Sequence, residues 1–158
     1  MNVLLLSMAS HLVATQLLPP WWVPDLTLIG LVVVIIRTPR RWLTYSALAG
    51  LFTMCWVARD PVPIGLAYGV VGWVTQLLMQ EWDLGDPRLA CGVVAAACAA
   101  MTLGLLWLED LWSAVMIGWF MIRVTVTIGS ALLAHRVLRH LLGPPAPTKS
   151  PGHGRGIL

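Results

Sequence analysis

Six apolar segments follow one another along this chain, with only a few residues between neighbours. Each is 16 to 23 residues long, close to the ~20 apolar residues that carry a helix across the hydrocarbon core of a bilayer. The chain is 58% hydrophobic and 11% charged, whereas soluble domains are about 25% charged. The sequence therefore predicts an all-α integral membrane protein, with a six-helix transmembrane bundle over residues 1–142 and no separate soluble domain. The predicted spans are residues 3–18, 21–36, 42–58, 61–79, 88–108 and 112–134.

The positive residues lie mostly on one side of the predicted membrane. With the N-terminus inside the cell, eight of the ten Lys and Arg residues fall inside, which satisfies the positive-inside rule. Arg37, Arg40 and Arg41 form the densest group, in the turn after the second segment. Residues 143–158 contain four prolines and four glycines, a composition typical of disorder. We therefore predict that both termini are cytoplasmic and that 143–158 is a disordered basic tail.

Small residues recur at every fourth position of the fifth segment. Gly92, Ala96, Ala100 and Gly104 form this stripe, which places them on one face of a helix. Membrane helices approach each other most closely at such faces. Packing within the bundle is the simpler interpretation. The alternative is a docking face for a membrane helix of another protein.

Two residues of opposite charge lie within the predicted spans, where charged groups often have functional roles. On the helical rise, Arg123 is about 16 Å below the outer surface and Asp25 about 6 Å. The difference of about 10 Å exceeds the comfortable reach of an arginine, so a direct pair requires helix tilt. We expect Arg123 instead to be satisfied by backbone carbonyls, by hydroxyls such as those of the neighbouring Thr125, Thr127 and Ser130, or by a lipid phosphate. A role in a transport pathway or with a partner is the remaining alternative.

Residue patterns that would indicate an enzyme or a metal site are missing from the sequence. His11 is a lone histidine in the first segment, and a hydrogen-bonded core histidine is its simplest interpretation. No CxxC, HExxH, Walker or GxGxxG motif occurs, and no pair of carboxylates lies at one depth. The net charge of +3 reflects membrane topology rather than nucleic-acid binding. We therefore expect a protein without catalytic residues, metal or cofactor.

Residues 24–65 carry a more specific pattern. Pro24-Asp25-Leu26 opens an apolar helix, and a basic turn, Pro39-Arg40-Arg41, follows it. Gly50-Leu51 then lies within the next helix, and Ile64-Gly65 begins the one after. This pattern, over about a quarter of the chain, resembles the bacterial rod shape-determining protein MreD family. The family usually has an aspartate where this chain has Met54, so the resemblance is to a divergent member.

The resemblance implies a non-enzymatic membrane scaffold of the cell-elongation (rod) complex, which supports cell shape and lateral peptidoglycan synthesis. It implies location in the bacterial cytoplasmic (inner) membrane. The implied partners are an MreC-like bitopic membrane protein, a RodA-type glycosyltransferase with its transpeptidase and, indirectly, MreB. It also implies a fold similar to the membrane S-component of energy-coupling-factor transporters. Under this hypothesis, the stripe and the turn with Arg37, Arg40 and Arg41 are the expected contact surfaces.

Two other functions fit the same predicted architecture. The first is a substrate-binding membrane component of a vitamin-type transporter, which needs a polar or aromatic pocket near the outer side. Asp25, Trp56 and Trp112 are its candidate lining residues. The second is a helix bundle with only a structural or lipid-binding role.

Overall fold

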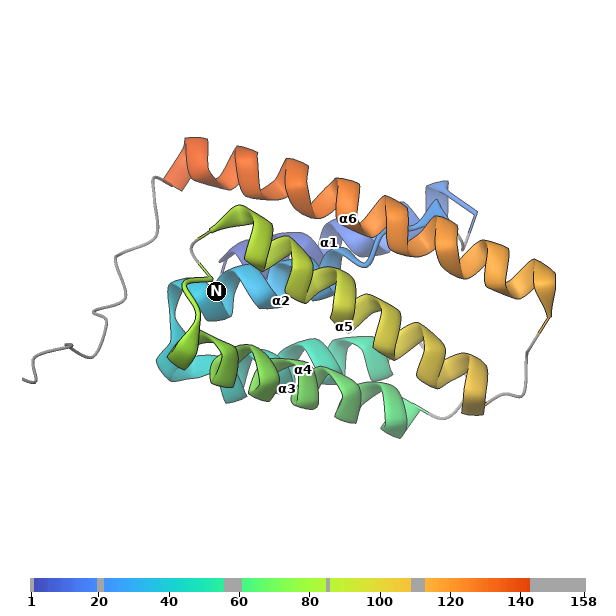
Figure 1. The fold of residues 1–158 in the computed structure, drawn as a ribbon, viewed down its shortest axis with the longest axis horizontal. Helices are drawn as coiled ribbons and strands as arrows, with labels where there is room; N and C mark the ends of the chain where they lie inside the picture. Colours follow the sequence, from blue (N-terminus) through green and yellow to red (C-terminus); the bar gives the residue numbers. More distant parts are fainter. Residues whose placement is uncertain (1, 20–21, 56–60, 85, 109–112, 143–158) are drawn as a thin grey trace, which may run out of the picture.

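The computed structural model describes residues 2–19, 22–55, 61–84, 86–108 and 113–142. These residues form six α-helices and one short 3-10 helix, with no strand among them (Figure 1). The prediction of an all-α chain is therefore confirmed. The predicted tail, 143–158, and the tryptophans Trp56 and Trp112 lie outside the described residues. The elements are α1 (Asn2–Leu17), α2 (Leu26–Arg37), η2 (Pro39–Arg41), α3 (Trp42–Met54), α4 (Pro61–Glu81), α5 (Pro87–Leu108) and α6 (Ala114–Leu142).

Helix α2 forms the centre of the bundle and contacts each of the other five helices. Its sequence from Leu26 to Ile36 is apolar on every side apart from Thr27, and a helix of this kind is stable only when surrounded by protein or lipid. Eight of its twelve residues are buried. The core therefore follows α2 along its whole length.

The start of α2 differs from the prediction. The sequence predicts a helical span from residue 21, whereas α2 begins at Leu26, and Val23, Pro24 and Asp25 are not helical. Pro24 explains the difference, because proline lacks a backbone N–H and disfavours helical geometry at the residue before it. The segment before α2 therefore enters the bundle as irregular chain.

Glycines set the closest helix contacts. A Cβ added to Gly50 of α3 would lie 2.9 Å from the carbonyl oxygen of Gly65 in α4. Farther along the same pair, Ser46 lies against Gly72. Such close approach is how membrane helices associate without a strong hydrophobic drive, so α3 and α4 form a tight pair.

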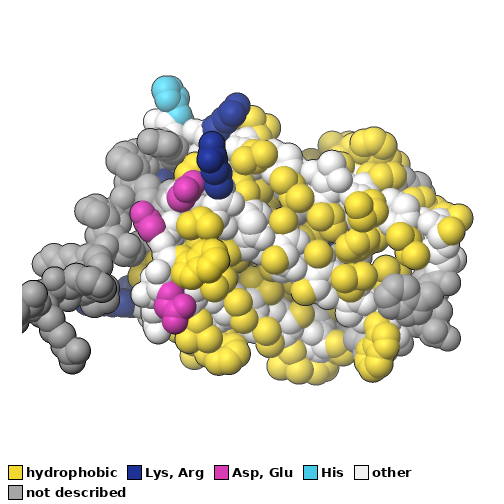
Figure 2. All heavy atoms as spheres, viewed as in Figure 1, with side chains coloured by type: hydrophobic (Ala, Val, Ile, Leu, Met, Phe, Trp, Pro, Cys, Tyr) yellow, Lys and Arg dark blue, Asp and Glu magenta, His cyan; other side chains and the backbone are white. Residues whose placement is uncertain are grey.

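Three helices are long and apolar enough to cross a membrane. The qualifying stretches are Val62–Glu81 in α4, Pro87–Gly104 in α5 and Ala114–Val137 in α6. Few of their residues are buried within the chain, and large apolar side chains cover the outer face of these helices (Figure 2). Helices α1 and α2 are apolar but shorter, with 16 and 12 residues. Among the described residues, three helices therefore qualify as candidate spans by length and composition, and the six crossings stay a prediction.

The charged side chains visible on this face gather at one end of the bundle (Figure 2). Arg37 ends α2, Glu81 ends α4 and Arg88 lies in the first turn of α5. The beginning of α1 and the end of α6 lie at this same end (Figure 1). We call it the charged end.

Candidate functional site

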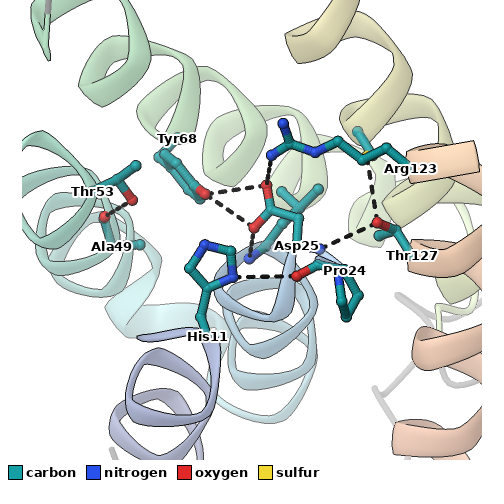
Figure 3. Close-up of polar contacts among 10 residues, drawn as sticks. His11, Pro24, Asp25, Ala49, Thr53, Tyr68, Arg123 and Thr127 are labelled. Carbon is teal, nitrogen blue, oxygen red and sulfur yellow. Dashed lines mark hydrogen bonds and ion pairs between the residues drawn. The ribbon is translucent and has the colours of Figure 1, made fainter. Parts of the chain in front are cut away.

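A buried polar cluster surrounds Asp25, the residue just before α2 (Figure 3). Its side chain is almost completely buried, and its Oδ1 accepts a hydrogen bond of 3.0 Å from the backbone N–H of Leu28. This bond caps α2, and a carboxylate at this position also complements the helix dipole. The hydroxyl of Tyr68, from α4, donates to the same carboxylate, at 3.1 Å from Oδ1 and 3.3 Å from Oδ2.

Arg123 of α6 completes an ion pair with Asp25. One terminal guanidinium nitrogen, Nη2, lies 3.8 Å from Asp25 Oδ2. The arginine side chain is 34% exposed, and its buried Nε has no hydrogen-bond partner in the described residues. The contact is therefore an ion pair at the long end of the range, and the guanidinium keeps donors that Asp25 does not use.

The pairing contradicts the expectation that other groups satisfy Arg123. That expectation placed Asp25 by the helical rise, but residues 23–25 are not helical. The backbone turns at Asp25, where the N–H of Leu26 donates to the carbonyl oxygen of Pro24 at 2.8 Å. The helical rise of about 1.5 Å per residue therefore does not give the position of Asp25 relative to Arg123.

Thr127 joins three elements beside this pair. It is fully buried, and its hydroxyl oxygen accepts a hydrogen bond of 3.2 Å from the backbone N–H of Asp25. The thiol of Cys98, from α5, also contacts this oxygen at 3.7 Å. Thr127 thus holds the irregular chain before α2 against both α5 and α6.

His11 lies on the other side of the same irregular segment. Its Nδ1 is 3.2 Å from the carbonyl oxygen of Pro24, which fits a hydrogen bond when Nδ1 carries the proton. The structure therefore brings His11, Asp25 and Arg123 together around the start of α2 (Figure 3).

The contacts of the cluster anchor the start of α2 to α4 and α6. Both oxygens of Asp25 are occupied by groups of the chain itself. No group of three or more His, Cys, Asp or Glu residues that could hold a metal ion occurs among the described residues. Tyr68 is not among the site residues that the sequence predicts. Its position in the middle of an apolar helix is the signal, because a buried tyrosine hydroxyl needs a partner.

The small-residue stripe of α5 has no close partner in the described chain. Helix α5 packs through its other face, where Cys91, Val94 and Cys98 are buried. In the stripe, Gly92, Ala96 and Ala100 are exposed. A Cβ added at Gly92 or Gly104 would have nothing within 4 Å. The stripe is therefore open, which differs from the simpler expectation that it packs within the bundle.

An apolar groove of about 500 Å³ runs along this open stripe, between α4 and α5. We call it the α4–α5 groove. From α5 come Gly92, Ala96 and Ala100, and from α4 come Val70, Val74 and Leu78. Trp82 and Arg88 line its end at the charged end of the bundle.

The basic turn predicted as a second contact surface lies apart from this groove. Arg37 is the last residue of α2, and Arg40 and Arg41 belong to η2. None of the three lines the α4–α5 groove, whose only lining cation among the described residues is Arg88. The sequence indicates only a topological role for Arg88 and no connection with the stripe. Arg88 and Gly92 line the same groove and lie one helical turn apart on α5.

In comparisons with known proteins, no family model matches this chain, and no curated protein or solved structure is significantly similar to it.

Proposed function

We propose that this protein is a non-enzymatic membrane scaffold of the bacterial cell-elongation complex, related to the MreD family. In this proposal the chain crosses the cytoplasmic membrane six times, and both termini are cytoplasmic. The charged end of the bundle, with Arg37, Arg40 and Arg41, then faces the cytoplasm, as the positive-inside rule favours. The resemblance of residues 24–65 supplies the family, and the apolar outer face supports the membrane location.

The observation that carries the proposal is the open stripe of α5. Closely packed membrane helices place small residues where they meet, as Gly50 and Gly65 do in this chain. Gly92 and Gly104 are equally small, but a Cβ added to either glycine would have no neighbour within 4 Å. We infer that a helix from another protein packs on this stripe. An MreC-like bitopic protein offers such a helix and connects the scaffold to the RodA-type synthase, its transpeptidase and MreB.

The residues that carry the family resemblance lie at helix contacts in the structure. Asp25 caps α2 and pairs with Arg123, while Gly50 packs on Gly65. Met54, where the family usually has an aspartate, fills the space beside Gly65. A role in helix packing explains why a motif of mostly apolar residues can mark a family whose members are scaffolds rather than enzymes.

Recovery of the partner tests the proposed surface. The chain, carrying an affinity tag, is expressed in its native cell, and the MreC-like protein that copurifies is quantified. We expect Ala96→Leu to lower recovery about tenfold, since overpacking a helix contact costs 1–3 kcal/mol. Ala47→Leu makes the same change at an exposed position of α3 and leaves recovery unchanged. Equal recovery with both variants would refute the stripe as the contact surface.

A further inference from the structure

The α4–α5 groove extends across only part of the thickness of a membrane. On α5 its lining runs from Arg88 to Ala100, twelve residues that rise about 18 Å. The hydrocarbon core of a bilayer is about 30 Å thick, so one leaflet contributes about 15 Å. The groove therefore has the length of a single leaflet, and it begins at the charged end.

The groove is apolar over most of its length and polar at the charged end, which matches the acyl chain and the head group of a lipid. Its walls from Val70 and Ala100 down to Leu78 are apolar apart from Thr75, whose hydroxyl donates to the carbonyl oxygen of Val71, and such walls suit an acyl chain. Trp82 and Arg88 then follow at the charged end, and both residue types favour the level of the lipid head groups. The guanidinium of Arg88 forms no ion pair with a described residue, so it is available to a phosphate.

Acidic residues next to the groove restrict the kind of head group. The stretch that joins α4 to α5 includes Glu81 at the end of α4 and Asp86 before Pro87. Asp86 caps α5, because its Oδ1 accepts a hydrogen bond of 2.9 Å from the backbone N–H of Arg88. Figure 2 shows acidic and basic side chains side by side at this end. A purely anionic head group would meet these carboxylates, whereas a head group with both a phosphate and an ammonium complements both charges.

We propose that the α4–α5 groove binds one zwitterionic phospholipid of the ethanolamine type from the leaflet at the charged end. One acyl chain lies between α4 and α5 along Gly92, Ala96 and Ala100. The phosphate binds Arg88, and the ammonium lies near Glu81. This site does not depend on the scaffold function, because the lipid occupies the groove whenever no protein helix packs on the stripe. A partner helix would displace the lipid.

Lipid retention by the purified chain tests the site without any partner protein. The protein, in detergent, is equilibrated with equal amounts of dioleoyl phosphatidylethanolamine and dioleoyl phosphatidylglycerol, and bound lipid is counted by native mass spectrometry. We expect the ethanolamine lipid to dominate. Ala96→Leu, which fills the groove, lowers its retention about tenfold. Val74→Phe fills the groove from α4 and gives the same result if the first variant does not fold.

Two charge variants test the phosphate contact and the ammonium contact of the head group separately. Arg88→Gln lowers retention of both lipids about threefold, the scale of one exposed ion pair. Glu81→Gln lowers the preference for the ethanolamine lipid over the glycerol lipid by about the same factor. Arg136→Gln changes a second exposed arginine, on α6 outside the groove, and leaves retention unchanged.

Equal retention of the two lipids by the wild-type chain would overturn the head-group assignment. Full retention by Ala96→Leu and Val74→Phe, both folded, would overturn the groove as the site. The scaffold proposal fails separately, because it concerns recovery of a protein. Arg88→Gln is expected to lower lipid retention while the recovery of the MreC-like protein stays unchanged.

Discussion

The guanidinium of Arg123 lies 3.8 Å from the carboxylate of Asp25, and this pair connects α6 to the irregular chain before α2. The same carboxylate caps α2 and accepts the Tyr68 hydroxyl from α4. One buried side chain therefore fixes the position of the central helix relative to two outer ones. This arrangement predicts how the stability of the bundle responds to substitutions.

Replacing Asp25 by alanine is expected to lower the stability of the protein by about 3 kcal/mol. The substitution removes the cap of α2 and leaves the buried hydroxyl of Tyr68 and the charge of Arg123 without their partner. Asp25→Asn keeps a capping oxygen and is expected to cost less. Thermal unfolding in detergent, followed by circular dichroism, gives the order wild type, Asn, Ala. A melting temperature for Asp25→Ala equal to that of the wild type would show that the cluster does not anchor α2.

The ion pair itself is expected to contribute only about 1 kcal/mol. The distance of 3.8 Å is long, and about a third of the Arg123 side chain is exposed. A double-mutant cycle with Asp25→Asn and Arg123→Gln measures this coupling from the unfolding free energies of four proteins. A coupling above about 3 kcal/mol would contradict this assignment and indicate a fully buried pair.

Tyr68→Phe is expected to cost about 1 kcal/mol, the net value of one hydrogen bond. The change removes only the hydroxyl that donates to Asp25, and the ring stays in the core. Tyr45→Phe serves as the control, because the Tyr45 hydroxyl makes only a 3.3 Å contact with Thr38 in a partly buried position. Chemical unfolding gives the free energy of unfolding of both variants. A loss of stability for Tyr45→Phe equal to or larger than that for Tyr68→Phe would count against the role of the Asp25 cluster.

Two glycine-to-alanine substitutions are expected to have different effects on the stability of the protein. Gly50→Ala places a methyl group 2.9 Å from the backbone oxygen of Gly65, which cannot move without separating α3 from α4. We expect a loss of about 2 kcal/mol, typical of overpacking. Gly92→Ala meets open space and is expected to leave stability unchanged or slightly raised. Comparison of the two melting temperatures tests whether the stripe is open, and a similar loss in both variants would mean that α5 is packed there.

The sequence predicts the helical architecture well, because long apolar segments between short polar turns permit few alternatives. It places Asp25 incorrectly relative to Arg123, since depth along a helix was applied to residues 23–25, which are not helical. Pro24 was the available signal for this error, because the residue before a proline disfavours helical geometry.

The two small-residue faces mark a second limit of sequence analysis. Ser46 and Gly50 of α3 lie against α4, whereas Gly92 and Ala96 of α5 border an open groove. Both pairs have the same spacing of four residues. The spacing indicates that another helix can pack closely on this face. Only the three-dimensional arrangement shows whether such a helix is present and which one it is. For the same reason, the groove with Arg88 at its end could not be predicted from the sequence.

Depletion of this protein in its native cell tests the scaffold function most directly. Cell shape is scored by microscopy as the protein is lost, in medium with and without a mixture of vitamins, and re-expression of the wild-type chain provides the control. The proposal predicts that rod-shaped cells become round and that no vitamin prevents the change. Cells that keep their shape, with growth restored by a single vitamin, would contradict it and indicate a transporter component instead.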